Sequence, residues 1–263
     1  MTKCDDTTVV FVTGGASGVG RAIAESFIAN EAAVHVCDAS AEHIDDFLRD
    51  HPKASATVCD VADPGQVEVA FADLMSTHGR LHVLINNAGI SGPAAPVEDI
   101  SLDSWNRCVK VNLDGAFYVT RQAVPLLKQQ QGGVIVNVAS NAGLLGCPNR
   151  SPYVASKWGM IGLTKTWAME LGPYNIRVNA VCPTSVEGAR IEGVIKQDAA
   201  RRGRTGDEIR EVYQRQSSMR TFVTAEDVAN MVTFLASDQA ARISGQAIAV
   251  DGHTETLSNW LDH

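Results

Sequence analysis

The chain alternates short apolar runs with longer stretches in which apolar residues recur every three or four positions. The short runs are rich in β-branched residues, which is typical of buried parallel strands. Seven such runs lie at residues 8–12, 33–37, 55–59, 81–85, 133–138, 175–181 and 246–250. The stretches between them predict helices at 21–29, 41–50, 63–78, 103–128, from 151 onward, and at 224–237.

Strands and helices alternate along the whole chain without a repeat or a linker rich in Pro and Gly. This order predicts an α/β fold of one domain spanning 1–263, a doubly wound parallel sheet with helices on both faces. Residues 184–222 break the alternation and are expected to form an irregular, partly helical insertion. Ligands of such sheets bind at the carboxyl ends of the strands. Polar or glycine-rich segments follow those ends at the 13–20 loop, Asp38, Asp60, Asn87, Ser140 and Pro183.

The sequence TGGASGVG at residues 13–20 follows the first predicted strand and precedes a helix. In this context glycines let the backbone approach a pyrophosphate, and the helix N-terminus favours its negative charge. A glycine motif alone is weak evidence, and the other interpretation is a plain tight turn.

Asp38 ends the second predicted strand, about 20 residues beyond the glycines. A carboxylate there can accept hydrogen bonds from ribose hydroxyls and would repel a 2′-phosphate. Ser17 and Ala39 flank the same place and neither is basic, so the charges favour NAD over NADP. The alternative role for Asp38 is to cap the helix that begins near residue 41.

Tyr153 and Lys157 are four residues apart, which places them on one face of a helix. Ser151 is a suitable N-cap and Pro152 a suitable first helical residue. A free tyrosine has a pKa of about 10, and a base acting near neutrality needs a value roughly 3 units lower. A nearby ammonium and a helix N-terminus favour that change. The alternative is an amphipathic helix with an interfacial tyrosine.

Composition excludes several functions. The net charge of −8 and the 6% aromatic content argue against nucleic-acid binding. No apolar run approaches 18 residues, and the polar N-terminus is unlike a signal peptide, so we expect no membrane span. The six cysteines form no C-x-x-C pair and no His/Cys cluster has zinc spacing. We therefore expect no metal, and a reducing, cytoplasmic setting.

The combined motifs resemble the short-chain dehydrogenase/reductase family over residues 8–252. The resemblance is carried by the TGGASGVG loop, Asp60-Val61, the NNAG segment at 86–89, Asn112, Ser140, the YVASK segment at 153–157 and Pro183. It implies a seven-stranded Rossmann fold, a nicotinamide cofactor, which the charge of Asp38 favours as NAD, and usually a homotetramer. Ala155, Gly159 and Gly162 are small residues that would permit close helix approach between subunits.

The resemblance also implies roles for individual residues. Tyr153 is expected to be the acid/base and Ser140 to bind the same substrate oxygen, while Lys157 assists Tyr153 and holds the nicotinamide ribose. Asn112 is expected to hold a water linked to Lys157. The expected cofactor residues are Gly14, Ser17, Gly18, Val19 and Gly20 at the phosphates, Asp38 at the ribose, Asp60 and Val61 at adenine, Asn87 at the neighbouring sugar, and Tyr153, Lys157, Pro183 and Val186 at the nicotinamide half.

Three positions depart from the family pattern. Thr184 stands where glycine often follows Pro183, and Gly188 stands where a threonine is expected. The side-chain hydroxyl contact to the cofactor at position 188 is therefore missing, although Thr184 or Ser185 could replace it. His253 stands where a second glycine is common, and a surface or interface histidine is the favoured interpretation.

Substrate contacts are expected from residues 91–95, 141–150 and 184–222, with Asn141 joining Ser140 and Tyr153. The insertion carries eight basic and six acidic side chains, a net charge of +2, which would suit an anionic substrate. The alternative is a solvated helical segment with internal ion pairs. Asn149 and Arg150 suggest a polar substrate, whereas Leu144 and Leu145 suggest an apolar wall.

The leading interpretation is an NAD(H)-dependent oxidoreductase that interconverts a small secondary alcohol and its ketone. The alcohol would be of the polyol, sugar-like or hydroxy-acid type. One alternative is a reductase of 3-oxoacyl thioesters, which Asp38 opposes because such enzymes commonly use NADP. Another is a nucleotide-sensing protein without turnover, which has no need of the Asn112, Ser140, Tyr153 and Lys157 set.

Overall fold

The computed structural model describes residues 8–257. The expectations for the polar N-terminus and for Cys4 therefore fall on residues 1–7, outside the described residues.

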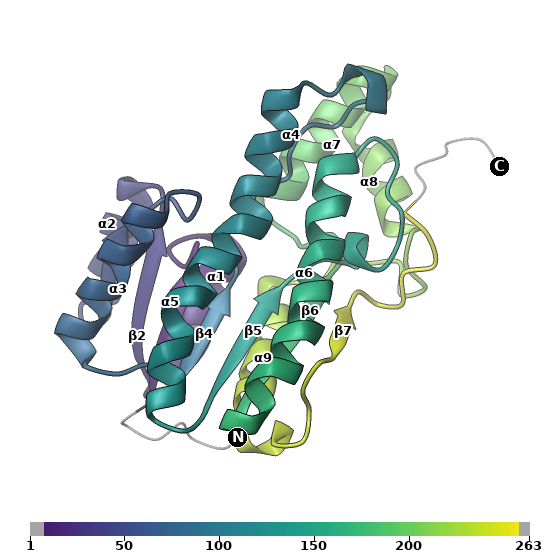
Figure 1. Ribbon diagram of the computed structural model, residues 1–263. Coiled ribbons are helices and arrows are strands. Elements are labelled where there is room, and N and C mark those ends of the chain that lie inside the picture. The colour runs from purple at the N-terminus through teal and green to yellow at the C-terminus, as the bar shows by residue number, and fades with distance from the viewer. Residues whose placement is uncertain (1–7, 258–263) are drawn as a thin grey trace.

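A seven-stranded sheet forms the centre of the molecule, as predicted (Figure 1). Its strands are β1 (Val9–Thr13), β2 (Ala33–Asp38), β3 (Ser55–Val58), β4 (Val83–Asn86), β5 (Gly133–Val138), β6 (Ile176–Pro183) and β7 (Ala247–Val250). Their order is β3-β2-β1-β4-β5-β6-β7, and each neighbouring pair is parallel. The chain reverses direction across the sheet between β1 and β4, so their carboxyl ends flank the crevice in which ligands of such folds bind.

Helices cover both faces of this sheet. They are α1 (Gly18–Ala29), α2 (Ala41–Asp50), α3 (Pro64–His78), α4 (Leu102–Val109), α5 (Gly115–Gln129), α6 (Ser151–Leu171), α7 (Ala189–Arg202), α8 (Gly206–Gln214) and α9 (Ala225–Ala236). Short helical turns lie at Val97–Asp99, Lys110–Asp114, Asn141–Gly143, Gly172–Tyr174 and Asp238–Ala240.

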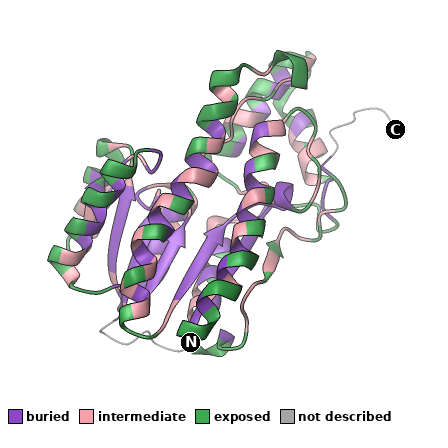
Figure 2. Cartoon of the chain, viewed as in Figure 1, coloured by how far each residue is buried: buried purple, intermediate pink, exposed green. Residues whose placement is uncertain are grey.

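Two apolar cores lie on opposite faces of the sheet. Residues of α1, α2 and α9 form one core with side chains such as Phe27, Phe47 and Val232. Residues of α3, α5 and α6 form the other, which includes Phe71 and Trp167. The inner strands β1, β2, β4, β5 and β6 are accordingly mostly buried, the edge strands β3 and β7 are partly exposed, and the outer sides of the helices are exposed (Figure 2). This double cover explains why the strands read as continuous apolar runs.

The predicted elements differ from the structure mainly at their ends. Strands begin or end one or two residues from the expected positions. The single helix expected at 103–128 is instead α4, a π-helical turn at Lys110–Asp114, and α5. The proposed capping of α6 is wrong by one residue, because Ser151 is its first helical residue and Arg150 occupies the N-cap without a side-chain bond.

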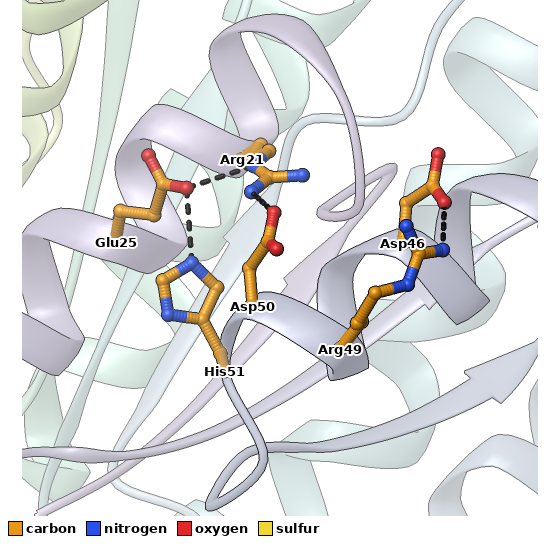
Figure 3. A network of polar contacts seen from close by, with 6 residues as sticks. All are labelled: Arg21, Glu25, Asp46, Arg49, Asp50 and His51. Carbon is orange, nitrogen blue, oxygen red and sulfur yellow. Dashed lines mark hydrogen bonds and ion pairs between the residues drawn. The ribbon is translucent and has the colours of Figure 1, made fainter.

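An ion-pair network joins α1 to α2 next to the glycine loop (Figure 3). Arg21 lies in the first turn of α1 and donates to Glu25 at 2.7 Å and to Asp50 of α2 at 2.6 Å. His51 contacts Glu25 at 3.0 Å. Burial alone would raise the pKa of Glu25, but hydrogen bonds from Arg21 and His51 outweigh it and lower that pKa. The network fixes the start of α1, and therefore the end of the glycine loop.

The insertion at 184–222 forms α7 and α8, above the carboxyl ends of the strands and beside the start of α6 (Figure 1). Ile191, Ile195, Ala199, Ile209 and Phe222 give it an apolar cluster of its own. Five of its basic side chains pair with acids of the same segment, at Arg201–Asp198, Arg202–Asp198, Arg204–Glu208, Arg210–Glu192 and Arg215–Glu211. Most of its positive charge is therefore neutralised internally, which favours the ion-paired interpretation of this segment over an anion-binding one.

Candidate active site

A cleft of about 1490 Å³ lies at the carboxyl ends of the strands. Sites for one small molecule usually measure about 300–1,000 Å³, so this cleft has room for a dinucleotide and a second molecule. Its lining includes Gly14, Ser17, Gly18, Val19, Gly20, Asp38, Asp60, Val61, Asn87, Ser140, Asn141, Tyr153, Lys157, Pro183 and Val186. All predicted site residues except Asn112 thus border a single cavity.

The glycine loop is held against the end of β4 by Asn87. The Asn87 side-chain amide donates to Thr13 O and to Gly14 O, both at 3.0 Å. A Cβ at Gly20 would lie 2.0 Å from Gly14 O and 2.4 Å from Asn87 Nδ2, so only glycine fits there. Gly18 has φ +53°, a conformation that glycine adopts without strain. The loop therefore has the close backbone packing needed to cradle a diphosphate.

Asp38 is positioned to accept hydrogen bonds from a ligand. Its Oδ1 accepts from Ser40 N at 3.1 Å, and its side chain is 12% exposed. Ser40, not Asp38, is the N-cap of α2, because the Ser40 hydroxyl accepts from His43 N. The helix-cap alternative for Asp38 is therefore wrong. The Asp38 carboxylate borders the cleft and can accept further hydrogen bonds there.

Asp60 and Val61 border the same end of the cleft. Asp60 Oδ1 accepts from Ala62 N at 3.0 Å, and Asp60 Oδ2 pairs with Arg107 of α4 at 2.9 Å. Val61 is buried, and a Cβ at Gly115 would lie 2.7 Å from its side chain. Arg107 was not predicted from the sequence, because it lies 47 residues from Asp60 and only the fold brings them together.

Tyr153 and Lys157 lie on the first turns of α6 and face the middle of the cleft. The Lys157 ammonium is 5.8 Å from the centroid of the Tyr153 ring and donates to Val138 O at 2.9 Å. Lys157 is only 4% exposed. Burial, and to a smaller extent the charge of Arg190, lowers the pKa of Lys157 to about 8. Lys157 is thus a buried cation within reach of the phenol ring.

Asn112 lies behind the wall of the cleft, inside the π-helical turn. Its side chain accepts from Ile90 N at 2.7 Å and donates to Ile90 O at 2.9 Å and to Ser156 Oγ at 3.2 Å. The π turn places the Asn112 amide where it can contact both the loop after β4 and α6. Such π turns are frequent at functional sites. Asn112 therefore ties the loop beside Lys157 to the helix that carries it.

Ser140 follows β5 and caps the short turn at Asn141–Gly143. Its hydroxyl accepts from Ala142 N at 3.2 Å and lies 3.3 Å from Asn141 Oδ1. The Asn141 amide donates to Thr254 Oγ1 at 3.0 Å. Both side chains are buried at the cleft wall, so Asn141 orients Ser140 as well as bordering the cavity.

The segment after β6 forms the opposite wall. On either side of Val186, Ser185 O and Glu187 N bond to the backbone of Val223, at 3.2 and 2.9 Å. Gly188 occupies the N-cap of α7 with φ +130°, a value that a threonine would adopt only with strain. The glycine at position 188, where the family pattern has threonine, therefore matches the backbone conformation that the structure has there.

The residues expected to contact substrate divide between the cleft and its surroundings. Asn149 and Arg150 border the cleft, whereas Leu144 and Leu145 are not among its lining residues. Ile191 and Val194 of α7 give the cleft apolar lining instead.

His253 is exposed and contacts Ser218 Oγ at 2.7 Å, as the favoured surface interpretation requires.

Sequence reasoning missed the buried polar groups that align the strand ends. The Thr13 hydroxyl accepts from Asn87 N at 3.0 Å and Ala88 N at 3.1 Å, which joins β1 to the loop after β4. Asn86 donates to Asn137 Oδ1 at 2.8 Å, and Asn137 donates to Thr164 Oγ1 at 2.8 Å. A polar residue within an otherwise apolar strand was the only available signal.

The described residues contain no group of three or more His, Cys, Asp or Glu side chains arranged to hold a metal ion. Within the same part of the chain, no helix is long and apolar enough to cross a membrane.

Sequence comparisons place this chain among known oxidoreductases. The family profile described as enoyl-(acyl carrier protein) reductase matches residues 14–253. The chain is 37% identical to the 3-oxoacyl acyl-carrier-protein reductase FabG of Thermotoga maritima, over 93% of this chain and 96% of that protein. It is 35% identical to levodione reductase of Leifsonia aquatica, over 93% of this chain and 92% of that protein.

Solved structures agree with this placement. An actinorhodin polyketide ketoreductase variant with NADPH superposes with a TM-score of 0.91 at 31% identity, over 95% of this chain and 98% of the other. An NAD+-bound xylitol dehydrogenase superposes with a TM-score of 0.88 at 29% identity, over 93% of this chain and 97% of the other. With nearly its whole length matched by a family profile, by curated relatives and by structures, this chain belongs to the short-chain dehydrogenase/reductase family of oxidoreductases.

Proposed function

We propose that this protein is an NAD(H)-dependent dehydrogenase that interconverts a small secondary alcohol and its ketone, with Tyr153 as the acid/base. The observation that carries the proposal is the convergence of Ser140, Tyr153 and Lys157 on one wall of a cleft whose other end is a glycine-rich cradle. Nicotinamide bound in that cleft supplies the acceptor or donor for the hydride of the carbinol carbon.

Tyr153 moves the proton in this proposal. During oxidation its phenolate oxygen takes the hydroxyl proton of the substrate while the carbinol hydride leaves, so that the alcohol becomes a ketone. The Ser140 hydroxyl donates to the same substrate oxygen and holds it beside Tyr153. The buried Lys157 ammonium, 5.8 Å from the ring centroid, stabilises negative charge on the phenol. Reduction reverses each step.

Asp38 supports NAD as the cofactor. Its carboxylate lies in the cleft at the end of β2, where it can accept from both hydroxyls of the adenosine ribose. A 2′-phosphate there would meet a negative charge instead. We expect kcat/KM to favour NAD over NADP by about 5- to 150-fold, the scale of leaving one buried polar group unpaired. Asp38→Ala combined with Ala39→Arg should narrow this ratio, whereas faster turnover with NADP by the unmodified protein would contradict it.

The substrate end of the cleft supports a small alcohol with both polar and apolar parts. Asn149 and Arg150 lie on one side, and Ile191 and Val194 on the other. The relatives include a levodione reductase, a cyclohexanol dehydrogenase and a D-β-hydroxybutyrate dehydrogenase, whose names all point to oxygen at a secondary carbon. The described cysteines are free thiols, and we propose the cytoplasm as the compartment.

Homotetramer formation is part of the same proposal. The outer face of α6 carries Ala155, Trp158, Gly162 and Met169 at helical spacing, and all four are exposed in the single chain. Gly162 has open space around it, so a second helix could approach closely there. Gly159, by contrast, packs against Leu113 of its own chain.

Reduction of a 3-oxoacyl thioester is the second candidate, because the relative at 37% identity carries that name. Asp38 opposes it for the reason given above. A non-catalytic nucleotide sensor is the third candidate, and the convergence of Ser140, Tyr153 and Lys157 opposes it.

The deciding experiment compares Tyr153→Phe with the unmodified protein. NADH absorbance would be followed over a panel of secondary alcohols, polyols, hydroxy acids and their ketones, together with an acetoacetyl thioester. Loss of the phenolic oxygen should reduce turnover about 10²–10⁴-fold, the usual effect of removing a proton-transfer group. Tyr174→Phe, the same change at an exposed site outside the cleft, is the matched control and should stay within about twofold.

Calorimetry must show that Tyr153→Phe still binds NAD. Retention of more than about a tenth of the turnover by that variant would exclude Tyr153 as the acid/base. Tight NAD binding with silence toward the whole panel would favour the sensor. Preference for the thioester would favour the second candidate.

A further inference from the structure

Arg190 reaches across the cleft from α7 to the end of the sheet. It is the second residue of α7, and its guanidinium donates to Gly89 O in the loop after β4. A Cβ at Gly89 would lie 3.7 Å from Lys157 Nζ, so this contact lies close to the Lys157 ammonium. Arg190 therefore bridges the two walls of the cleft beside a second cation.

Among the described residues, no carboxylate forms an ion pair with Arg190. Five other arginines of the 184–222 segment pair with acids, whereas the Arg190 guanidinium bonds to the neutral carbonyl of Gly89. The charge of Arg190 is also one of the causes that lower the pKa of Lys157. Two cations thus share this part of the cleft, an arrangement that an anionic ligand would stabilise.

The position of Arg190 indicates which anion. Gly89 follows Asn87 by two residues, and the Asn87 amide holds Thr13 O and Gly14 O of the glycine loop at 3.0 Å. Gly89, whose carbonyl the guanidinium contacts, thus belongs to the same short segment as the residue that holds the phosphate cradle, and it lies beside Lys157. Gly188, two residues earlier, lacks the hydroxyl expected to contact the cofactor at that position, and its φ of +130° disfavours any replacement side chain.

We propose that Arg190 binds the diphosphate of the dinucleotide, replacing the side-chain contact that is missing at position 188. This inference rests on the dinucleotide binding of the proposed function. On binding, the guanidinium exchanges Gly89 O for phosphate oxygens, which it can engage with two N–H groups at once. Because Arg190 belongs to α7, the same contact draws that helix toward the cofactor. An anionic group on the substrate is the competing occupant.

The test measures binding by calorimetry, without turnover. The ligands are NAD, ADP-ribose, which keeps the diphosphate but lacks nicotinamide, and adenosine, which lacks both. Arg190→Gln should weaken NAD and ADP-ribose about 10- to 100-fold, the range for removal of a charge-assisted hydrogen bond. Adenosine should change less than about twofold. Arg210→Gln, which removes an arginine of the same segment outside the cleft, is the matched control and should bind all three ligands normally.

Four outcomes are informative. Unchanged binding of NAD and ADP-ribose by Arg190→Gln overturns the inference, and an accompanying rise in KM for a substrate would assign Arg190 to a substrate anion instead. Weakened binding of NAD with unchanged binding of ADP-ribose by Arg190→Gln also overturns it, because the contact would then lie in the nicotinamide half. Weakened binding of both ligands in a protein that oxidises no alcohol supports the inference while the proposed function fails. Absence of both NAD and ADP-ribose binding by the unmodified protein overturns both.

Discussion

Lys157 should make the stability of the cofactor-free protein rise at alkaline pH. Its ordinary pKa of 10.5 falls to about 8 in the folded chain, first because of burial and second because of Arg190. At about 1.36 kcal/mol per pKa unit, the difference corresponds to about 3 kcal/mol against the charged form. That amount is a large fraction of the usual stability of a domain, which is about 5–15 kcal/mol. The substitution Lys157→Met replaces the ammonium with an uncharged thioether, so it removes this titration while the side chain keeps a similar length.

The direction follows from the protons bound in each state. Below about pH 8 both the folded and the unfolded chain hold the Lys157 proton, so the penalty is present in full. Between about pH 8 and 10.5 the unfolded chain holds the proton more often, and stability rises with pH. The free energy of unfolding should therefore rise in the unmodified protein relative to Lys157→Met, by about 2 kcal/mol between pH 7.5 and pH 10.

Urea unfolding of both proteins at a series of pH values measures this difference. Protein concentration must be the same throughout, because the stability of an oligomer depends on it. Titration of groups distant from Lys157 affects both proteins equally and cancels. Lys165→Met, a change at an exposed lysine of the same helix, should give a curve parallel to the unmodified protein. Parallel curves for Lys157→Met as well would refute the burial of a charged Lys157.

Three further predictions concern the fold, the cradle and the assembly. Burial, and secondarily the charge of His78, lowers the pKa of His35 to about 4, so its neutral form is favoured. Relative to His35→Gln, the unmodified protein should lose about 3 kcal/mol of stability from pH 6.5 to 4. An equal fall in the free energy of unfolding for both proteins, measured with urea, would contradict this. Gly20→Ala should reduce NAD affinity at least about tenfold by calorimetry, the cost of roughly one missing hydrogen bond, because the added Cβ would clash with Gly14 O and Asn87 Nδ2. Gly172→Ala, at a position with open space outside the cleft, should leave NAD affinity unchanged. Light scattering at micromolar concentration should give a tetramer that Trp158→Glu dissociates, and a monomeric unmodified protein would exclude the proposed assembly.

The positions of the strands and the place of the site could be predicted because they depend on local pattern. Each inner parallel strand is buried on both faces, so its apolar run is visible in the sequence, and the residue that follows the strand lies at the ligand edge. Asp38 and Ser140 were found in this way, since each ends a run of β-branched residues. Asp60, Asn87 and Pro183 were placed at the same edge because each follows the end of a predicted parallel strand.

The remaining features depend on contacts between distant segments. Asn112 is an unusual residue within a helix, but nothing local predicts the π turn that brings its amide to Ile90 and Ser156. Thr13 was predicted only as the first residue of the glycine loop, and nothing local shows that its hydroxyl accepts from the loop after β4. Arg190 is one of eight basic residues in the insertion, and only the structure distinguishes it from those that form ion pairs.

The separate apolar cluster of α7 and α8 has a consequence for how this protein could diverge. Ile191, Ile195 and Phe222 pack with one another and are not part of the two cores that flank the sheet. Substitutions that reshape this segment therefore leave the packing of the strands, and with it the placement of Tyr153 and Lys157, intact. In the proposed function, selection could therefore remodel the surface that faces the alcohol in small steps while the residues proposed for hydride transfer keep their positions.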